Sequence, residues 1–367
     1  MKRKSFWVFV LILCVFLACL CTNYDYDLFA RIIVGERFVE GGVLPFKDFL
    51  SYTPTHNWYD HEWGSSVIFY IILKYLGAFG LLLFYAVMLF LTTFFVVKTQ
   101  RLQKHAFPVS IIFTSLFTVL FVREKNKKSK PKLMWAIPFV TIFWSNVHGG
   151  VVSGLGLIFM YMLGEFLNKK PCKDYFISLS VSAPLLIINP YGFNYLNFLF
   201  SATTMNRKYI TEWWPFFHPR HFWYYIETSL FGIFSYIVMI VNFFRKKRFD
   251  YTKFLVVSVT LAEGLWHVKL LTLSLIAVSA LCYNEIFSLF IRMKKLLKPV
   301  EKSIYYAILV LIFFIPLYSP LVPRADLYKF PLYEIEFLKI NDIKGNLLTD
   351  FGFGSYAIYK LYPDNLI

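Results

Sequence analysis

The chain has 367 residues, of which 58% are hydrophobic and 21% aromatic, and its formal net charge is +16. Soluble globular domains are about 45–50% apolar. The excess here forms separated continuous runs, which argue against a soluble domain and against the alternating strands of a membrane barrel. Because lipid offers no partners to backbone polar groups, the expected class is an all-α polytopic membrane protein.

The positive charge is concentrated in short loops. These basic loops are residues 2–4, 98–104, 123–132, 169–173, 245–248 and 292–302. Loops rich in Lys and Arg mark the cytoplasmic side of a membrane protein. We therefore expect membrane lipids as partners, with their anionic headgroups next to these loops, and no nucleic acid.

The first half of the chain predicts a large polar insertion between apolar segments. Segment 6–21 is expected to be an uncleaved helix that leaves the cytoplasm, and 22–65 is expected to be a large first external loop. The run 66–97 then returns, and its first part, Val67–Leu76, is expected to lie along the interface because a lysine and a glycine interrupt the run. The run 108–122 breaks the pattern, since the most basic loop follows it at once. It is a re-entrant element, or a helix has been lost here.

After residue 132 the alternation is regular. The expected spans are 133–145, 151–167, 175–188, 223–244, 254–267, 270–288 and 304–322. A short external turn lies at Asn146–Gly150, and a second external region lies at 189–222. The sequence thus predicts a bundle of roughly 9–11 transmembrane helices within residues 1–322, with a cytoplasmic N-terminus and a small external tail at 323–367.

Two carboxylates open the first external loop. Asp25 and Asp27 lie two positions apart just beyond the first helix, so in an extended chain both face the same way. Paired carboxylates can hold a divalent cation, or one can accept a proton from an incoming nucleophile. A solvated helix end is the alternative interpretation.

A denser group closes the same loop. Asp60, His61 and Glu62 are three consecutive ionisable residues beside Trp63, and Asp48 lies earlier in the loop. A carboxylate–imidazole–carboxylate run suits binding of a phosphate with a metal, or of a sugar that stacks on an aromatic ring. The aromatic residues also fit the ordinary interface belt.

Further candidate binding residues lie beyond the first loop. His148 belongs to the turn sequence NVHGG, and it either points into a cavity or forms part of a plain helix hairpin. The later external parts contribute Glu212, Arg220, His267 and Lys269. Ionisable residues in a membrane protein are costly and default to a function, and a lysine or arginine here can hold a lipid phosphate.

Several motifs, in their order, resemble the GT-C class of integral membrane glycosyltransferases. They are DYDLFARIIVGE, LPFKDFLSYTPTHNWYDHEW, WSNVHGG, INPYG, TEWW and LLTDFGFGSYAIYKLYP. The likeness covers most of the chain and is to a bacterial branch of that class, distantly similar to protein mannosyltransferases and to catalytic subunits of oligosaccharyltransferases. Against that pattern the chain lacks a helix after Arg123 and ends early. We therefore expect a shortened copy with an incomplete tail. Such shortening would leave the fold and can abolish the activity.

The resemblance implies a hexosyltransferase-like enzyme of the bacterial plasma (inner) membrane. Its donor would be a polyprenyl-phosphate-linked sugar, and its acceptor a glycan, lipid or protein on the external face. The general base would be an acid of the first loop, a role that falls to Asp25 or Asp27. Some members use a divalent metal such as Mg or Mn, for which Asp25, Asp27 and His61 are the candidate ligands. Arg220, Lys269 and His61 are candidates to assist the outgoing phosphate.

Two other classes fit the composition. One is a transporter or flippase of a lipid-linked or amphipathic substrate, and the other is a non-catalytic membrane assembly protein of the same fold. Transporters place ionisable residues at the midplane of broken helices, often within repeats. Here the acids gather in an external loop and the sequence shows no repeat, which favours the enzyme. The sequence also contains no Walker lysine motif and no dinucleotide fingerprint.

Overall fold

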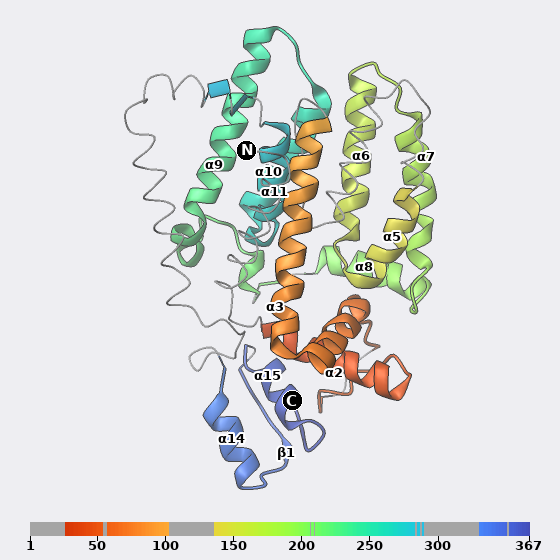
Figure 1. Ribbon diagram of the computed structural model, residues 1–367, viewed down its shortest axis with the longest axis vertical. Coiled ribbons are helices and arrows are strands. Elements are labelled where there is room, and N and C mark those ends of the chain that lie inside the picture. Colours follow the sequence, from red (N-terminus) through yellow and green to blue (C-terminus); the bar gives the residue numbers. More distant parts are fainter. Residues whose placement is uncertain are drawn as a thin grey trace. The chain divides into compact units, whose positions relative to one another are not determined.

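The protein is largely α-helical in the part of the chain that the structure describes (Figure 1). This structure, a computed structural model, describes residues 26–53, 57–102, 136–205, 207–208, 210–282, 285–286, 288–289, 330–350 and 352–367. The chain divides into two compact units. Unit 1 takes its described residues from Met1–Leu89, Ser145–Gly149 and Ile308–Ile367, and unit 2 takes its own from Phe90–Trp144 and Gly150–Ala307. The predicted runs 6–21, 108–122 and 304–322 lie outside the described residues.

The segment expected as the first external loop contains a helix, α2 (Tyr26–Gly41). Phe29, Ile32 and Ile33 recur at helical spacing and are 4%, 2% and 5% exposed. An apolar stripe of this kind folds as a helix when a partner surface covers it. We expected a polar loop here because of its acids, and the apolar stripe was not predicted.

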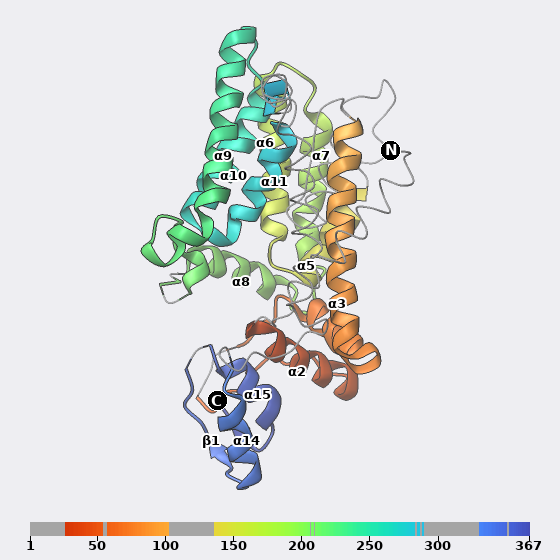
Figure 2. The same cartoon turned by 60° about the vertical axis from the view of Figure 1, so that its left-hand side comes forward.

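The covering partner is the C-terminal tail. It consists of α14 (Leu332–Ile340), β1 (Gly345–Asn346), α15 (Gly354–Leu361) and β2 (Asn365–Leu366), and β1 and β2 pair in parallel. The ring of Phe29 meets Phe330 and Tyr356 edge to face, with centroids 5.2 and 4.9 Å apart. Helix α15 therefore lies beside α2 (Figure 2), and the two segments share one apolar core.

Helix α3 (Trp63–Leu102) is interrupted where the sequence predicted an interruption. Gly77 has φ 63° and ψ −163°, a left-handed region of φ that glycine adopts readily. The helix before it, which includes Val67–Leu76, is thus set apart from the helix after it. Helix α3 also continues to Leu102, into the region expected as a basic loop.

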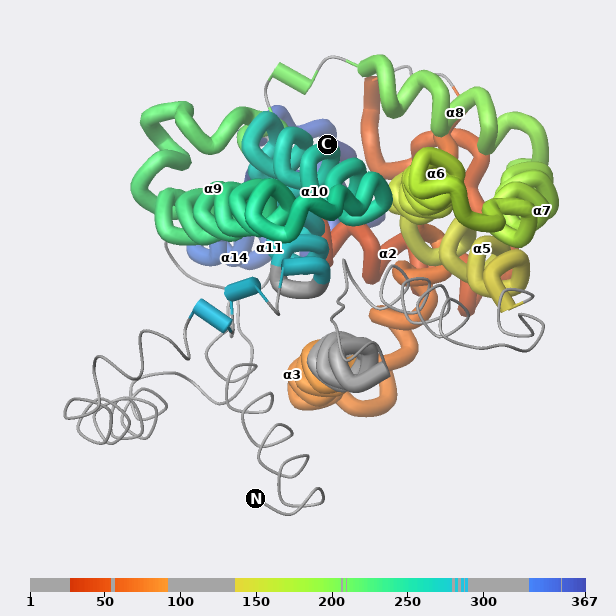
Figure 3. The backbone as a smooth tube through the Cα atoms, turned by 90° about the horizontal axis from the view of Figure 1, so that it is seen from above, coloured from red at the N-terminus to blue at the C-terminus, as the bar shows by residue number. Residues whose placement is uncertain are grey.

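Unit 2 is built from helices that pack at small residues. In chain order they are α5 (Ala136–Val147), α6 (Val151–Leu167), α7 (Lys173–Ser182), η2 (Pro184–Ile187), α8 (Phe193–Thr204), η3 (Thr211–Trp213), α9 (Pro219–Lys246), α10 (Tyr251–Trp266), η4 (Val268–Leu270) and α11 (Leu271–Leu281). Seen from above, α6 lies between α7 and α10 (Figure 3). A Cβ atom on Gly164 of α6 would clash with Thr252 of α10, so only glycine permits this close approach of the two helices.

The predicted boundaries in unit 2 are met in part. Helix α6 has the bounds expected for the span 151–167, and the turn expected at Asn146–Gly150 separates it from α5. The second external region, 189–222, contains a further helix, α8. This helix runs across the direction of α6 and α7 in both Figure 1 and Figure 2.

Two helices in the described part of the chain are long and apolar enough to cross a membrane. They are Trp63–Leu91 and Pro219–Lys246, and several shorter apolar helices accompany them. Length and composition alone make this a weak indication of membrane association. The number of spans and their orientation stay predictions.

Replacing Phe29 with alanine is expected to release the tail from α2. The substitution empties the centre of the unit 1 core, and such truncations cost about 3–5 kcal/mol. Limited proteolysis should then cut between α14 and α15 faster than in the unaltered protein. Phe337→Ala, at a ring that is 60% exposed in the same unit, is the matched control and should cost less than about 0.5 kcal/mol. Equal cleavage rates for both variants would contradict the shared core.

Candidate functional site

A buried carboxylate, Asp60, stands at the entrance to α3. Its side chain is 1% exposed and forms an ion pair with Arg31 of α2. Its Oδ1 accepts a hydrogen bond from the backbone N–H of Glu62 at 3.0 Å, and its Oδ2 accepts one from the Ser66 hydroxyl at 3.2 Å. A carboxylate at a helix N-terminus also gains from the helix dipole. The surrounding donors thus compensate for the loss of water around this charge.

The neighbouring carboxylate, Glu62, connects α2 to two histidines. Its Oε2 pairs with Arg31 at 2.8 Å. Its Oε1 lies 3.2 Å from Nε2 of His148 and 3.5 Å from Nε2 of His61. The side chain of Glu62 is 19% exposed, whereas that of His148 is 45% exposed. We call Arg31, Asp60, His61, Glu62 and His148 the acid–imidazole cluster.

The turn that carries His148 is fixed against the start of α3. The indole N–H of Trp63 donates a hydrogen bond to Oδ1 of Asn146 at 3.1 Å. A Cβ atom on Gly64 would lie 2.6 Å from the carbonyl oxygen of Asn146, so this approach requires glycine. The turn and the helix entrance therefore meet backbone to backbone, and this contact brings His148 to Glu62.

Arg31 is the residue of the cluster that the sequence reasoning missed. It lies in the motif DYDLFARIIVGE, within an acid-rich segment, and buried carboxylates need a cationic partner. The excess of acids around a single arginine was the sequence signal that could have identified Arg31. Asp27 lies one helical turn before Arg31 in the first turn of α2, so both project from the same side of that helix.

The environment of His61 keeps its ring neutral at ordinary pH. Loss of solvent around the ring is the main cause and lowers the pKa of His61 from 6.5 to about 4. Glu62 and Asp60 oppose this shift, and Arg31 and His148 add to it. A neutral imidazole accepts or donates one hydrogen bond at each nitrogen, so His61 is suited to polar contacts and not to the cationic role expected for it at the outgoing phosphate.

Two of the predicted first-loop acids have other surroundings. The carboxylate of Asp48 accepts hydrogen bonds from the backbone N–H groups of Leu50 and Ser51 at 2.9 and 3.3 Å. It therefore stabilises its own turn. Asp25 lies outside the described residues.

The later candidates form a second group, in unit 2. Lys269 pairs with Glu212 at 2.8 Å, and both side chains are about half exposed, at 44% and 53%. A ring nitrogen of His267 lies 2.7 Å from the carbonyl oxygen of Trp213. These contacts join η3 to the end of α10. Arg220 lies over the ring of Trp214, 5.8 Å from its centroid, so it belongs to the same aromatic surface.

The acid–imidazole cluster by itself does not suit a divalent metal, and the ligand set that the resemblance implied also includes Asp25, which lies outside the described residues. Mg²⁺ and Mn²⁺ prefer oxygen ligands, whereas Arg31 already compensates both carboxylates and both histidines face one oxygen of Glu62. Among the described residues, no three His, Cys, Asp or Glu side chains are arranged to hold a metal ion.

The arrangement is suited to proton transfer. With Nε2–H directed at Glu62, the Nδ1 atom of His148 is the basic nitrogen of the ring. A base whose ring is oriented by a carboxylate, itself held by a third group, is the recurring pattern of acid–base centres. Arg31, Glu62 and His148 form such a series. Comparison with known protein families, with curated proteins and with solved structures found no match, so a functional assignment depends on this geometry and on the sequence motifs.

Replacing Arg31 with methionine is expected to destabilise unit 1 strongly. It leaves the buried Asp60 carboxylate without its cation, and breaking such a pair costs about 3–5 kcal/mol. Thermal unfolding in detergent should show the loss. Adding Asp60→Asn to Arg31→Met removes the uncompensated charge and should restore part of the stability.

The matched control for this cycle is Arg37→Met on the same helix. The Arg37 guanidinium is exposed, hydrogen-bonds the Tyr362 hydroxyl at 2.9 Å and lies 4.3 Å from the centroid of the Phe49 ring, so its loss should cost about 1–2 kcal/mol. If the Arg31 variant loses no more stability than this control, the buried ion pair does not stabilise unit 1.

The titration of His61 offers a separate check. In the unfolded chain its pKa is near 6.5, and in the folded chain it is about 4. Between these values the unfolded chain binds more protons, so the free energy of unfolding should fall as the pH drops from about 6.5 to about 4. Hydrogen–deuterium exchange at C2 of the His61 ring, followed by mass spectrometry, should show a midpoint near pH 4. Glu62→Gln removes a carboxylate that raises this pKa, so the midpoint should move lower. A midpoint near 6.5 would show that the ring is solvated.

Proposed function

We propose that the protein is a membrane glycosyltransferase of the bacterial plasma membrane, similar to the GT-C class. In this proposal a polyprenyl-phosphate-linked sugar is the donor, and a hydroxyl-bearing glycan, lipid or protein on the external face is the acceptor. The observation that carries the proposal is the acid–imidazole cluster. It gathers the first-loop residues that the motifs singled out, Asp60, His61 and Glu62, with His148 from a separate motif.

The chemistry of transfer requires a base near the acceptor. The acceptor hydroxyl attacks the anomeric carbon, the bond from that carbon to the donor phosphate breaks, and the hydroxyl proton passes to the base. The resemblance gives this role to Asp27 or Asp25. The geometry supports a second acceptor for the proton, the His148 ring oriented by Glu62. Arg31, one turn from Asp27, holds Glu62 in place.

Membrane association rests on long apolar helices with exposed apolar surface. The candidate span of α3 carries Tyr75, Phe79 and Leu83 at 72%, 63% and 48% exposure. The candidate span of α9 carries Trp223 and Tyr224 near its start, at 79% and 84% exposure. Exposed aromatic and aliphatic side chains along a long apolar helix suit the interior of a bilayer, and exposed aromatic rings at a helix end suit its interface.

Substitutions at the cluster should separate the possible bases. Asp25→Asn, Asp27→Asn, Glu62→Gln and His148→Gln would be expressed in a strain that lacks the gene, and surface glycans would be measured by mass spectrometry. Loss of a general base lowers the rate of transfer by about 100-fold to 10,000-fold. The base is the residue whose replacement produces this loss while donor lipid accumulates.

Asp48→Asn is the matched control. It also converts a first-loop carboxylate to an amide, but the amide oxygen can still accept the hydrogen bonds from Leu50 and Ser51. Its glycan should equal that of the unaltered protein. Normal glycan in all four variants, each present in normal amount, would reject the enzyme. Accumulation of the lipid substrate in the inner leaflet would then indicate a flippase.

A further inference from the structure

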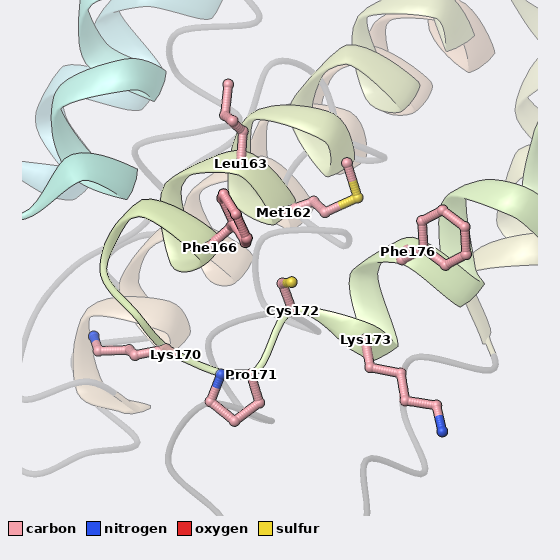
Figure 4. Close-up of a pocket in the computed structure, with 8 residues that line it drawn as sticks. All are labelled: Met162, Leu163, Phe166, Lys170, Pro171, Cys172, Lys173 and Phe176. Carbon is pink, nitrogen blue, oxygen red and sulfur yellow. The ribbon is translucent and has the colours of Figure 1, made fainter.

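A groove of about 480 Å³ lies between the end of α6 and the start of α7 in unit 2 (Figure 4). Its apolar wall is formed by Met162, Phe166 and Phe176, and Pro171 lies at the turn. Phe166 and Phe176 are 65% and 58% exposed. The groove is therefore open, and two aromatic rings on neighbouring helices are left to be covered by an apolar partner.

The basic turn between α6 and α7 borders one end of the groove. Lys170 and Lys173 line this end, and in Figure 4 their side chains extend away from the apolar rings and in different directions. The nearby acid Glu165 is buried at 3% exposure and accepts a hydrogen bond from Thr252 at 2.8 Å. It lies 3.8 Å from Lys170 and weakens that charge only in part. Asp174 in the first turn of α7 and Asp250, which accepts a hydrogen bond from Asn168 at 3.2 Å, are further acids near this turn.

The apolar surface continues along α6, away from the lysines. Phe159 on that helix is 48% exposed, and Phe166 is the next large exposed ring toward the basic turn. An occupant must thus be elongated, apolar along most of its length and anionic at one end. A phospholipid has this distribution, and loops rich in lysine face the leaflet that carries anionic lipids.

We propose that this groove binds an anionic phospholipid, with its phosphate beside Lys170 and Lys173 and an acyl chain along Phe166 and Phe176. The site belongs to unit 2 and shares no residue with the acid–imidazole cluster. It does not depend on the proposed function. Cys172 lines the same groove and is partly exposed, so its thiol can report on occupancy.

The test measures the rate at which Cys172 reacts with N-ethylmaleimide. Cys14, Cys19 and Cys21 would be replaced by serine, while Cys282 is fully buried and can remain. The full-length protein would be placed in nanodiscs of phosphatidylcholine, with and without phosphatidylglycerol. Each variant is compared with itself, because lysines near a thiol also change its basal reactivity. We expect phosphatidylglycerol to slow the labelling several-fold.

Lys170→Gln with Lys173→Gln should remove this protection. One lysine beside an anionic lipid contributes about fivefold in affinity, so the pair should weaken binding by about fivefold to thirtyfold, given the contact of Lys170 with Glu165. The matched control is Arg245→Gln with Lys246→Gln, which removes two exposed cations from another basic turn in the same unit. It should leave the protection of Cys172 unchanged.

Three outcomes would overturn the proposal. The first is that phosphatidylglycerol protects Cys172 in the Lys170 and Lys173 double variant as well as in the unaltered protein, which would indicate a general effect of surface charge. The second is that labelling of Cys172 is equally slow in nanodiscs of pure phosphatidylcholine. The third is that undecaprenyl phosphate added to the nanodiscs slows the labelling of Cys172 and phosphatidylglycerol does not. Loss of glycan transfer in the cluster variants would leave all of these readouts unaffected, so the two proposals fail separately.

Discussion

Unit 1 is organised around one requirement, that the buried carboxylate of Asp60 must have a cation. Arg31 supplies it from α2, 29 positions earlier in the chain. Because the same guanidinium also holds Glu62, the pair fixes the direction of a second carboxylate. Charge compensation in a buried site therefore decides how the entrance of α3 lies against α2. It also sets the position of Glu62, which both histidines contact.

Helix α2 couples this charged site to the C-terminal tail. One side of the helix buries Phe29 and Ile32 against α15, and another presents Arg31 to Asp60. A rigid helix cannot turn to improve one contact without disturbing the other. The tail, although far away in the sequence, thus contributes to the position of the candidate site, and loss of its core is felt at the cluster.

Local patterns predicted much of the fold. Apolar runs bounded by turn residues predicted α6 at its observed bounds, and a glycine within an apolar run predicted the interruption of α3 at Gly77. These features depend on neighbours along the chain. The stripe of α2 was missed because the segment was judged by its acids, and because the burial of Phe29 and Ile32 depends on the distant tail. The spans predicted in residues 6–21, 108–122 and 304–322 stay predictions.

For the candidate site, the sequence by itself determined that Asp60, His61 and Glu62 are together, since they are consecutive, and that His148 stands in a glycine-rich turn. Only the tertiary structure decided that Arg31 and His148 meet Glu62, that Asp48 stabilises its own turn, and that Glu212 and Lys269 form a group elsewhere. The physical reason is that an ion pair depends on distances of 3–4 Å between side chains. Such distances are set by how helices pack, and no local spacing encodes them.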